Sequence, residues 1–410
     1  MTIIMSLVGI VTLFGLAWLL SNNKKLINYR TVGTAFALQV AIAALILYVP
    51  GGDTALNALA GAVENVIAYA NVGILFLFGE LGERKPGTLI FAIHVLPVIV
   101  FFAALMATLY YLGIMQKVVS ILGGALHKLL RTSRVESMSV VADIFVGHTE
   151  APLVIRPYLS GMTNSELFMV MTAGMATIAG AVMAGYAAMG IDLKYLITAS
   201  FMGAPGAVLM AKIMMPETNY QDPKLDDAQY SDSGRPVNIF EAIANGARDG
   251  LMLALNVGAM LLAFVAMIAL LNGMITGVGG WFGFEALTFE KILGVVLAPL
   301  AFVLGVPWHE AAQAGSLIGQ KFVVNEFVAY INFVGVKSGL SAQTQVIVTF
   351  ALCGFANLSS IAMMLGGLGT LAPERRSDIA RLGLKAVLAG TLSNLMSATL
   401  AGLFFSLKSV

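Results

Sequence analysis

The chain has 410 residues, of which 59% are hydrophobic and only 11% are charged. Soluble globular proteins carry about 25% charged residues, so this composition indicates an integral membrane protein. A net charge of +1 gives no reason to expect a nucleic acid polymer as partner, and the single cysteine, Cys353, excludes an internal disulfide and a cysteine-based metal cluster.

Several apolar runs are long enough, at about 20 residues, to cross a bilayer as helices. The first run has no basic residues before it and is followed by NNKKLINYR, which is the reverse of a secretory signal peptide. We therefore expect it to be a retained helix. The eight predicted spans are residues 2–20, 31–49, 88–112, 164–189, 192–214, 248–272, 344–367 and 381–407.

Basic residues orient these spans, because cytoplasmic loops are enriched in Lys and Arg. There are three basic clusters: one follows the first predicted span, one follows the third, and one precedes the last. With eight spans, all three clusters lie inside only if both termini lie outside. The clusters are Lys24, Lys25 and Arg30; Lys117, Lys128, Arg131 and Arg134; and Arg375, Arg376, Arg381 and Lys385.

The remaining segments do not read as simple spans. Residues 53–69 and 116–131 are amphipathic and predict interfacial helices. Residues 215–247 are polar and predict a cytoplasmic loop with a short helix around FEAIANGA. Residues 135–160 and 288–333 are apolar but interrupted by VGHTEAPLVIRP and GVPWHEAAQAG, so we expect two re-entrant hairpins covered by protein or by a water-filled cavity.

The two halves of the chain share a pattern. In each half, a hairpin with a polar tip (EAPL, residues 150–153, and VNEF, residues 324–327) precedes a span that small or polar residues interrupt, at MATIAGAVMAGY and at FANLSS. Paired broken segments in two halves indicate a transporter whose binding site lies at the breaks.

Isolated polar residues in apolar segments indicate what this site binds. Glu150 and Glu326 are functional candidates because charge inside a membrane is costly, although Arg156 and Lys321 are near enough in sequence to pair with them. Asn357 is either a site residue or an interhelical hydrogen-bond partner. Two carboxylates with Asn, Ser and Thr suit a neutral, hydroxyl-rich solute, whereas an anionic solute would need Arg or Lys at the site. From these residues we expect a secondary transporter for a small polar solute.

Two other classes of function remain open from the residues alone. Asp143, His148 and Thr149 could form the catalytic group of an intramembrane hydrolase, but closeness in sequence is weak evidence for a triad. A passive channel is the second alternative. We favour transport, and therefore expect no catalytic residues, no enzyme activity and no cofactor beyond a coupling ion.

The motifs GHTEAPLVIRP, VNEFVAY, CGFANLSSIAMMLGGLG and GTLSNLMSATLAG, with GVPWHEA between them, resemble the concentrative nucleoside transporter family. The resemblance runs over essentially the whole chain and is to the bacterial eight-helix form. It implies an all-α polytopic membrane protein with eight transmembrane helices, two re-entrant hairpins, an inverted-repeat transport domain and a trimerisation scaffold. The implied function is cation-coupled import of nucleosides such as uridine by a homotrimer in the bacterial cytoplasmic (inner) membrane, through an elevator-type movement.

The resemblance also implies a division of the chain into segments. These are 1–112, spanning helices and an interfacial helix on the scaffold side; 113–214, an interfacial helix, the first hairpin and the following helices; 215–247, the cytoplasmic loop; 248–287, a long scaffold helix; 288–367, the second hairpin and broken helix; and 368–410, the C-terminal helix.

Site residues follow from the same resemblance. The nucleobase would face Gly147, His148, Thr149 and Glu150, with Val182 and Leu253 packed near it and Phe355 against its face. The ribose hydroxyls would contact Glu326, Asn357 and Ser360. Sodium would be held by Asp143, the Val146 carbonyl, the Thr177 hydroxyl and the Ile178 carbonyl.

Two residues depart from the family pattern. His148 stands where the family usually has glutamine, which leaves purine or pyrimidine preference open. Asp143 stands where sodium-coupled members have asparagine, and a carboxylate can bind a hard cation or carry a proton. We favour sodium as the coupling ion, with the proton as competitor. The alternative substrates are a free nucleobase or another ribosylated solute.

Overall fold

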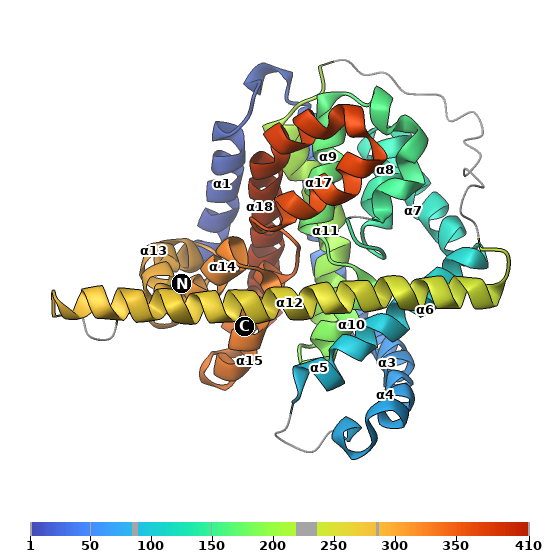
Figure 1. Cartoon of the computed structure of the whole chain (residues 1–410). Coiled ribbons are helices and arrows are strands. Elements are labelled where there is room, and N and C mark those ends of the chain that lie inside the picture. Colours follow the sequence, from blue (N-terminus) through green and yellow to red (C-terminus); the bar gives the residue numbers. More distant parts are fainter. Residues whose placement is uncertain are drawn as a thin grey trace.

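The computed structural model describes residues 2–49, 51–83, 89–148, 150–218, 236–283 and 287–408, with the side chain of Asp53 left out. The described part is helical and contains no strand (Figure 1). The predicted all-α membrane fold is therefore confirmed.

The first half contains α1 (Thr2–Leu19), α2 (Tyr29–Leu47), α3 (Gly52–Ala68), α4 (Ala70–Phe78), α5 (Phe91–His94), α6 (Leu96–Tyr111), α7 (Ile114–Leu130), α8 (Arg134–Ala142), the 3-10 helix η3 (Ala151–Gly161), α9 (Asn164–Ala176), α10 (Gly180–Ala188) and α11 (Leu193–Met214). The second half contains α12 (Ile239–Gly280), α13 (Phe289–Val303), α14 (Trp308–Val323), α15 (Glu326–Val336), α16 (Ala342–Leu352), α17 (Ser360–Leu371) and α18 (Arg376–Lys408). Short 3-10 turns η1 (Lys24–Leu26), η2 (Gly79–Gly82), η4 (Lys337–Gly339) and η5 (Pro373–Arg375) complete the described elements.

Eight helical segments in the described ranges are long and apolar enough to cross a membrane. Seven of them coincide with predicted spans: Thr2–Leu19, Tyr29–Tyr48, Phe91–Tyr111, Asn164–Ala188, Leu193–Met214, Ile239–Gly280 and Pro373–Lys408. The eighth, Thr54–Gly82, absorbs the predicted interfacial helix 53–69, because the apolar α4 (ANVGILFLF) continues it. The predicted helices 53–69 and 116–131 are present as α3 and α7, and α3 is followed after Tyr69 by the apolar α4.

The predicted span 344–367 is not one helix. Residues 353–359 separate α16 from α17, each of which is too short to span alone. Gly354 has φ +157°, and the Asn357 side chain accepts from the Ser360 N–H at 3.0 Å instead of continuing the helix. The predicted interruption at FANLSS is thus present, and it divides the span completely.

The prediction for residues 288–333 needs a similar correction, because this segment bends twice. Helices α13 and α14 form a bent pair at 115°, where Gly305 has φ +106° and Pro307 follows. The polar tip lies at the second bend, between Val323 at the end of α14 and Glu326 at the start of α15. The second hairpin is therefore α14–α15, and α13 is a separate helix packed against α14. In the first half, α8 and η3 form the corresponding hairpin.

Helix α12 is longer than predicted. Its 42 residues correspond to about 63 Å at 1.5 Å per residue, about twice the hydrocarbon core of a bilayer. FEAIANGA forms its first turns and is not a separate loop helix, because the Asn238 side chain caps the helix by accepting from the Glu241 N–H at 2.9 Å. Most of the predicted loop 215–247 falls on residues 219–235, which lie outside the described part.

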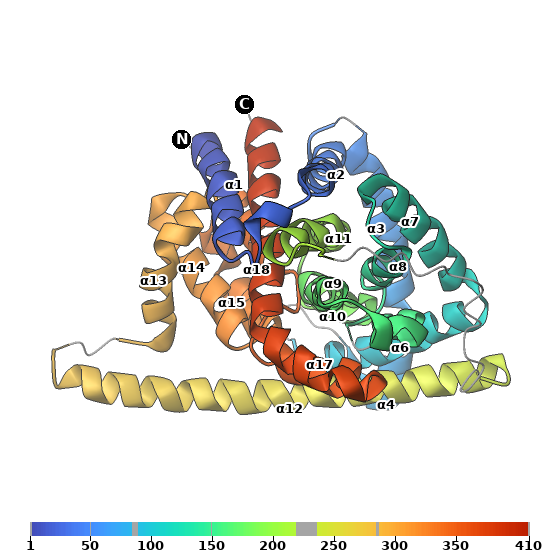
Figure 2. The ribbon, with the colours of Figure 1, turned by 90° about the horizontal axis from the view of Figure 1, so that it is seen from above.

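Glycine brings α12 close to α6. A Cβ on Gly250 would lie 2.7 Å from the Cβ of Ala103, and one on Gly246 would lie 2.5 Å from the Cβ of Ala107, so both positions require the absence of a side chain. The resulting long helix runs along one side of the bundle (Figure 2). Most of its surface is exposed.

Helix α18 packs against α1, α2, α9, α11, α16 and α17. The start of α1 and the end of α18 lie close together in both views (Figures 1 and 2). The centre of the fold is therefore the region where α18 passes the two interrupted helices α9–α10 and α16–α17.

Candidate substrate and cation site

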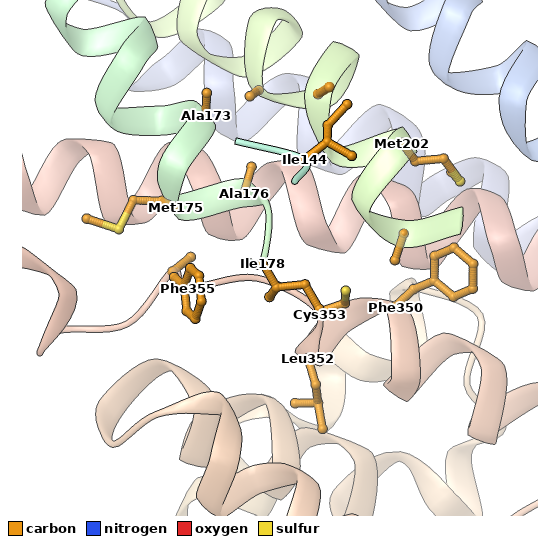
Figure 3. Packing of buried hydrophobic residues seen from close by; sticks show 14 of the residues in the cluster. Ile144, Ala173, Met175, Ala176, Ile178, Met202, Phe350, Leu352, Cys353 and Phe355 are labelled. Carbon is orange, nitrogen blue, oxygen red and sulfur yellow. The ribbon is translucent and has the colours of Figure 1, made fainter. Parts of the chain in front are cut away.

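The two helix breaks meet directly. The backbone N–H of Phe355, in the break between α16 and α17, donates to the carbonyl of Thr177, in the break between α9 and α10, at 3.2 Å. Figure 3 shows Ala176 and Ile178 of one break beside Cys353 and Phe355 of the other. Segments almost 180 residues apart thus lie together, and each leaves polar backbone groups that must find partners inside the protein.

Asn394 of α18 joins the two breaks. Its side-chain amide donates to the carbonyl of Ala176 at 2.7 Å and to that of Cys353 at 2.8 Å. A Cβ on Gly354 would collide with the Asn394 amide, so this position needs glycine for space. One fully buried side chain therefore satisfies the carbonyl at the end of α9 and another just after α16.

Lys321 lies beside the same junction. It is 1% exposed, and its ammonium donates to Asn394 Oδ1 at 2.7 Å and to the Ala351 carbonyl at 3.1 Å. A cation at the C-terminal end of α16 is favourable with the helix dipole. The hydrogen bonds of Lys321 go to Asn394 and Ala351, so among the described residues Glu326 is not its direct hydrogen-bond partner.

Glu326 is held by neutral donors. It lies in the first turn of α15 and is 3% exposed. Its Oε1 accepts from the Tyr186 hydroxyl at 3.0 Å, and its Oε2 accepts from the Asn357 side-chain amide at 2.8 Å. The carboxylate is therefore buried and oriented at both oxygens.

Asn357 and Ser360 form one network beside Glu326. The Oδ1 of Asn357 accepts from the Ser360 hydroxyl at 3.0 Å and from the Ser359 hydroxyl at 2.6 Å. The Ser360 hydroxyl also lies against the Phe355 carbonyl. A carboxylate, an amide and hydroxyls are thus concentrated at the start of α17, the chemistry that a polyhydroxyl solute requires.

His148 and Phe355 form the second wall of the site. Their ring centroids are 5.0 Å apart with the planes at 65°. A Cβ on Gly174 of α9 would collide with His148, so the imidazole fits tightly against that helix. Both ring nitrogens are buried without a hydrogen-bond partner among the described residues. Unpaired polar atoms beside an aromatic ring suit a planar ligand with hydrogen-bonding edges.

Asp143 has the same property and lies in the same hairpin. It follows α8, is 1% exposed, and neither carboxylate oxygen has a partner in the described part of the chain. The Thr177 hydroxyl donates to the Ala173 carbonyl at 2.9 Å, so its lone pairs remain free to accept. Val146, three residues after Asp143, and Ile178, next to Thr177 in the helix break, are both buried. A buried carboxylate without a partner is costly, which makes Asp143 a candidate to bind a cation or a proton.

The remaining predicted site residues differ in where the structure places them. Val182 is buried on α10, one turn before Tyr186 and on the same face. Gly147 lies in the turn after α8, and its carbonyl accepts from the Glu150 N–H at 2.9 Å. The Glu150 side chain is exposed, Leu253 is half-buried on α12, and Thr149 lies outside the described residues.

Sequence reasoning missed three residues of the junction: Tyr186, Lys321 as a helix-end cation, and Asn394. Lys321 and Asn394 carry a detectable signal, because each is a polar residue within an apolar segment. Tyr186 has no such signal, since buried tyrosines are common in cores.

A cavity of about 970 Å³ lies elsewhere, between α13, α14 and α15, lined by residues that include Glu290, Gly294, Gln320 and Asn332. None of the predicted site residues lines it. It is a mainly apolar groove without the buried polar groups of the helix junction.

A membrane-spanning chain with a repeated hairpin-and-broken-helix unit, whose breaks meet at buried polar groups, has the architecture of a secondary transporter. Family models described as "Na+ dependent nucleoside transporter C-terminus", "Na+ dependent nucleoside transporter N-terminus" and "Nucleoside recognition" match residues 195–402, 8–81 and 92–192. The chain belongs to the Na⁺-dependent nucleoside transporter family. It is accordingly a transporter and not an enzyme.

Its relatives match over nearly the full length. The chain is 53% identical to nucleoside permease NupC of Helicobacter pylori, covering 98% of each protein. It is 36% identical to rat sodium/nucleoside cotransporter 2, covering 98% of this chain and 63% of the longer rat protein. The solved structure of CNTnw in an inward-facing substrate-bound state matches with 54% identity, a TM-score of 0.96, and coverage of 100% of this chain and 99% of CNTnw.

The Asn394 junction gives the first prediction. Asn394→Ala should lower the free energy of unfolding by roughly 3 kcal/mol or more, because a buried ammonium and two buried carbonyls each lose a partner. Thermal unfolding of the purified protein in detergent measures this change. Ser393→Ala is the matched control, since the buried Ser393 hydroxyl has no partner in the described ranges. Equal melting temperatures for the two variants would contradict the role of Asn394.

Proposed function

We propose that this protein is a cation-coupled symporter that imports nucleosides across a bacterial cytoplasmic membrane. The observation that carries the proposal is the pairing of Glu326 and Asn357 at the joined breaks, with the unpaired Asp143 and His148 in the adjoining hairpin. Glu326 and Asn357 suit the hydroxyls of a sugar, His148 suits a base, and Asp143 suits a cation. Membership in the Na⁺-dependent nucleoside transporter family supports the assignment.

The substrate follows from the donors and acceptors. The ribose hydroxyls would bind Glu326, Asn357 and Ser360, and the base would lie against Phe355 beside His148. Val182, Leu253, Gly147, Thr149 and Glu150 are the further residues that the family resemblance would place on the base side. A free nucleobase lacks the hydroxyls and would leave the buried Glu326 carboxylate without ligand donors, so a nucleoside such as uridine is the better substrate.

Sodium is the coupling ion that the site supports best. An ionised Asp143 would neutralise it, with the Thr177 hydroxyl and the Val146 and Ile178 carbonyls as further ligands. These are the oxygen donors that hard cations prefer. The competing hypothesis is proton coupling, in which Asp143 itself carries the proton; its two unpaired oxygens favour that alternative as well.

We further propose an elevator-type movement within a homotrimer. Residues 113–214 and 288–367 would form the moving part, and residues 1–112 and 248–287, with the lipid-exposed α12, the scaffold. CNTnw, which is 54% identical, has structures named as inward-facing, intermediate and outward-facing, which supports alternating access. The packing of α1 along α18 supports the two termini sharing one side, which we assign to the outside.

The ribose contacts give a direct test of function. Glu326→Gln and Asn357→Ala should each lower uridine affinity about 30-fold or more, since losing one partner of a buried charge-assisted hydrogen bond costs roughly 2–5 kcal/mol. Radiolabelled uridine uptake into proteoliposomes with an imposed sodium gradient measures the loss.

The matched control is Glu290→Gln. Glu290 also accepts hydrogen bonds from an asparagine, Asn272, at 3.0 and 3.2 Å, but it lines the groove between α13 and α15. Uptake should persist in this variant. Normal uptake by Glu326→Gln, or loss of uptake in Glu290→Gln alone, would place the substrate elsewhere. Uridine that never exceeds its external concentration in the wild type would indicate a passive channel.

Asp143→Asn separates the two coupling ions. Under sodium coupling, uptake by the wild type requires a sodium gradient and changes little between about pH 6 and 8, and the variant keeps sodium-driven uptake through the amide oxygen. The measurement is uridine accumulation with sodium and pH gradients imposed separately. Accumulation driven by a pH gradient without sodium, and absent in Asp143→Asn, would establish the proton instead.

A further inference from the structure

Tyr186 is a fully buried residue of α10 whose hydroxyl contacts the proposed ribose site. It is 0% exposed and donates to Oε1 of Glu326 at 3.0 Å. The bond joins the two halves of the chain, because α10 follows the first helix break and α15 belongs to the second hairpin. Asn357 donates to the other oxygen, so the carboxylate is fixed from two sides.

The ring of Tyr186 is itself held in place. Its centroid lies 4.7 Å from that of Phe327 and 4.6 Å from that of Tyr330. With its ring packed between two aromatic neighbours, the hydroxyl has little freedom to leave Glu326. The position of this donor is therefore set by the packing of the core.

The two donors determine what Glu326 can still accept. An ionised carboxylate offers about four lone-pair sites, two on each oxygen. Tyr186 and Asn357 each occupy a site on a different oxygen, which leaves acceptor capacity on both. Two neighbouring hydroxyls of a sugar can then donate to the two oxygens together, in the plane that the donors fix.

We propose that Tyr186 is a positioning residue that sets selectivity for the ribose: by fixing the plane of the Glu326 carboxylate, its hydroxyl makes both oxygens available to the 2′ and 3′ hydroxyls of a nucleoside. This inference rests on the proposed function of the site. Without the Tyr186 hydroxyl, the carboxylate is held at Oε2 alone and can rotate away from the geometry that serves both hydroxyls.

Tyr330 provides a matched control. It is also fully buried, it packs against the same ring, and its hydroxyl donates to the Thr349 carbonyl at 2.8 Å instead of to Glu326. Tyr186→Phe and Tyr330→Phe each remove one buried, hydrogen-bonded hydroxyl and keep the ring. They should have similar effects on stability, and only the first should alter Glu326.

The experiment compares uptake of uridine, 2′-deoxyuridine and 3′-deoxyuridine in proteoliposomes. In Tyr186→Phe, the preference for uridine over each deoxy analogue should fall about 10-fold, mainly through KM for uridine, as expected from a hydrogen bond to a charged group. Tyr330→Phe should keep the wild-type preference. Because the preference is a ratio measured on the same vesicles, a lower yield of folded protein cancels out.

A second variant tests rescue. Replacing Tyr186 by 4-aminophenylalanine restores an N–H donor at the same end of the ring, and the preference for uridine should recover. An unchanged preference in Tyr186→Phe, or equal losses in Tyr186→Phe and Tyr330→Phe, would overturn the inference. Failure of the wild type to accumulate uridine would instead overturn the proposed function, so the two failures are distinguishable.

Discussion

Backbone groups freed by a broken helix must find partners inside the membrane, and the whole site depends on how this chain meets that requirement. The carbonyl of Thr177 accepts from Phe355, while the Asn394 amide takes the carbonyls of Ala176 and Cys353. These bonds make each break the partner of the other. Unsatisfied backbone groups would be costly in either broken helix alone. Here the two breaks satisfy one another and form a single packed junction against α18.

That junction also determines where the charges lie. Lys321 is held at the end of α16 through Asn394, and Glu326 lies on the next helix in the same hairpin, so the second hairpin carries a buried ammonium and a buried carboxylate beside the junction. The first half carries the buried Asp143, which has no hydrogen-bond or ion-pair partner among the described residues. An ionised Asp143 would therefore leave one negative charge without a protein counterion. Under the proposed function, a bound cation would supply the missing counterion, which is how cation binding and nucleoside binding would be linked.

Local sequence was sufficient to predict the breaks, the hairpin tips and most spans, because small and polar residues within apolar runs report directly on interrupted helices. It failed where the deciding partner is distant in sequence. The continuation of FEAIANGA into α12 depends on close packing against α6 through Gly246 and Gly250. The role of Tyr186 was missed for the same reason, since its partner Glu326 is 140 residues away.

The most direct measurement is an experimental structure of the protein with uridine and sodium bound. We expect the two ribose hydroxyls to lie within about 3.2 Å of the Glu326 carboxylate oxygens, with the base against Phe355 beside His148. Tyr186 and Asn357 should keep their present bonds to Glu326. Uridine bound in the groove between α13, α14 and α15, with the helix junction unliganded, would show that the junction is not the substrate site.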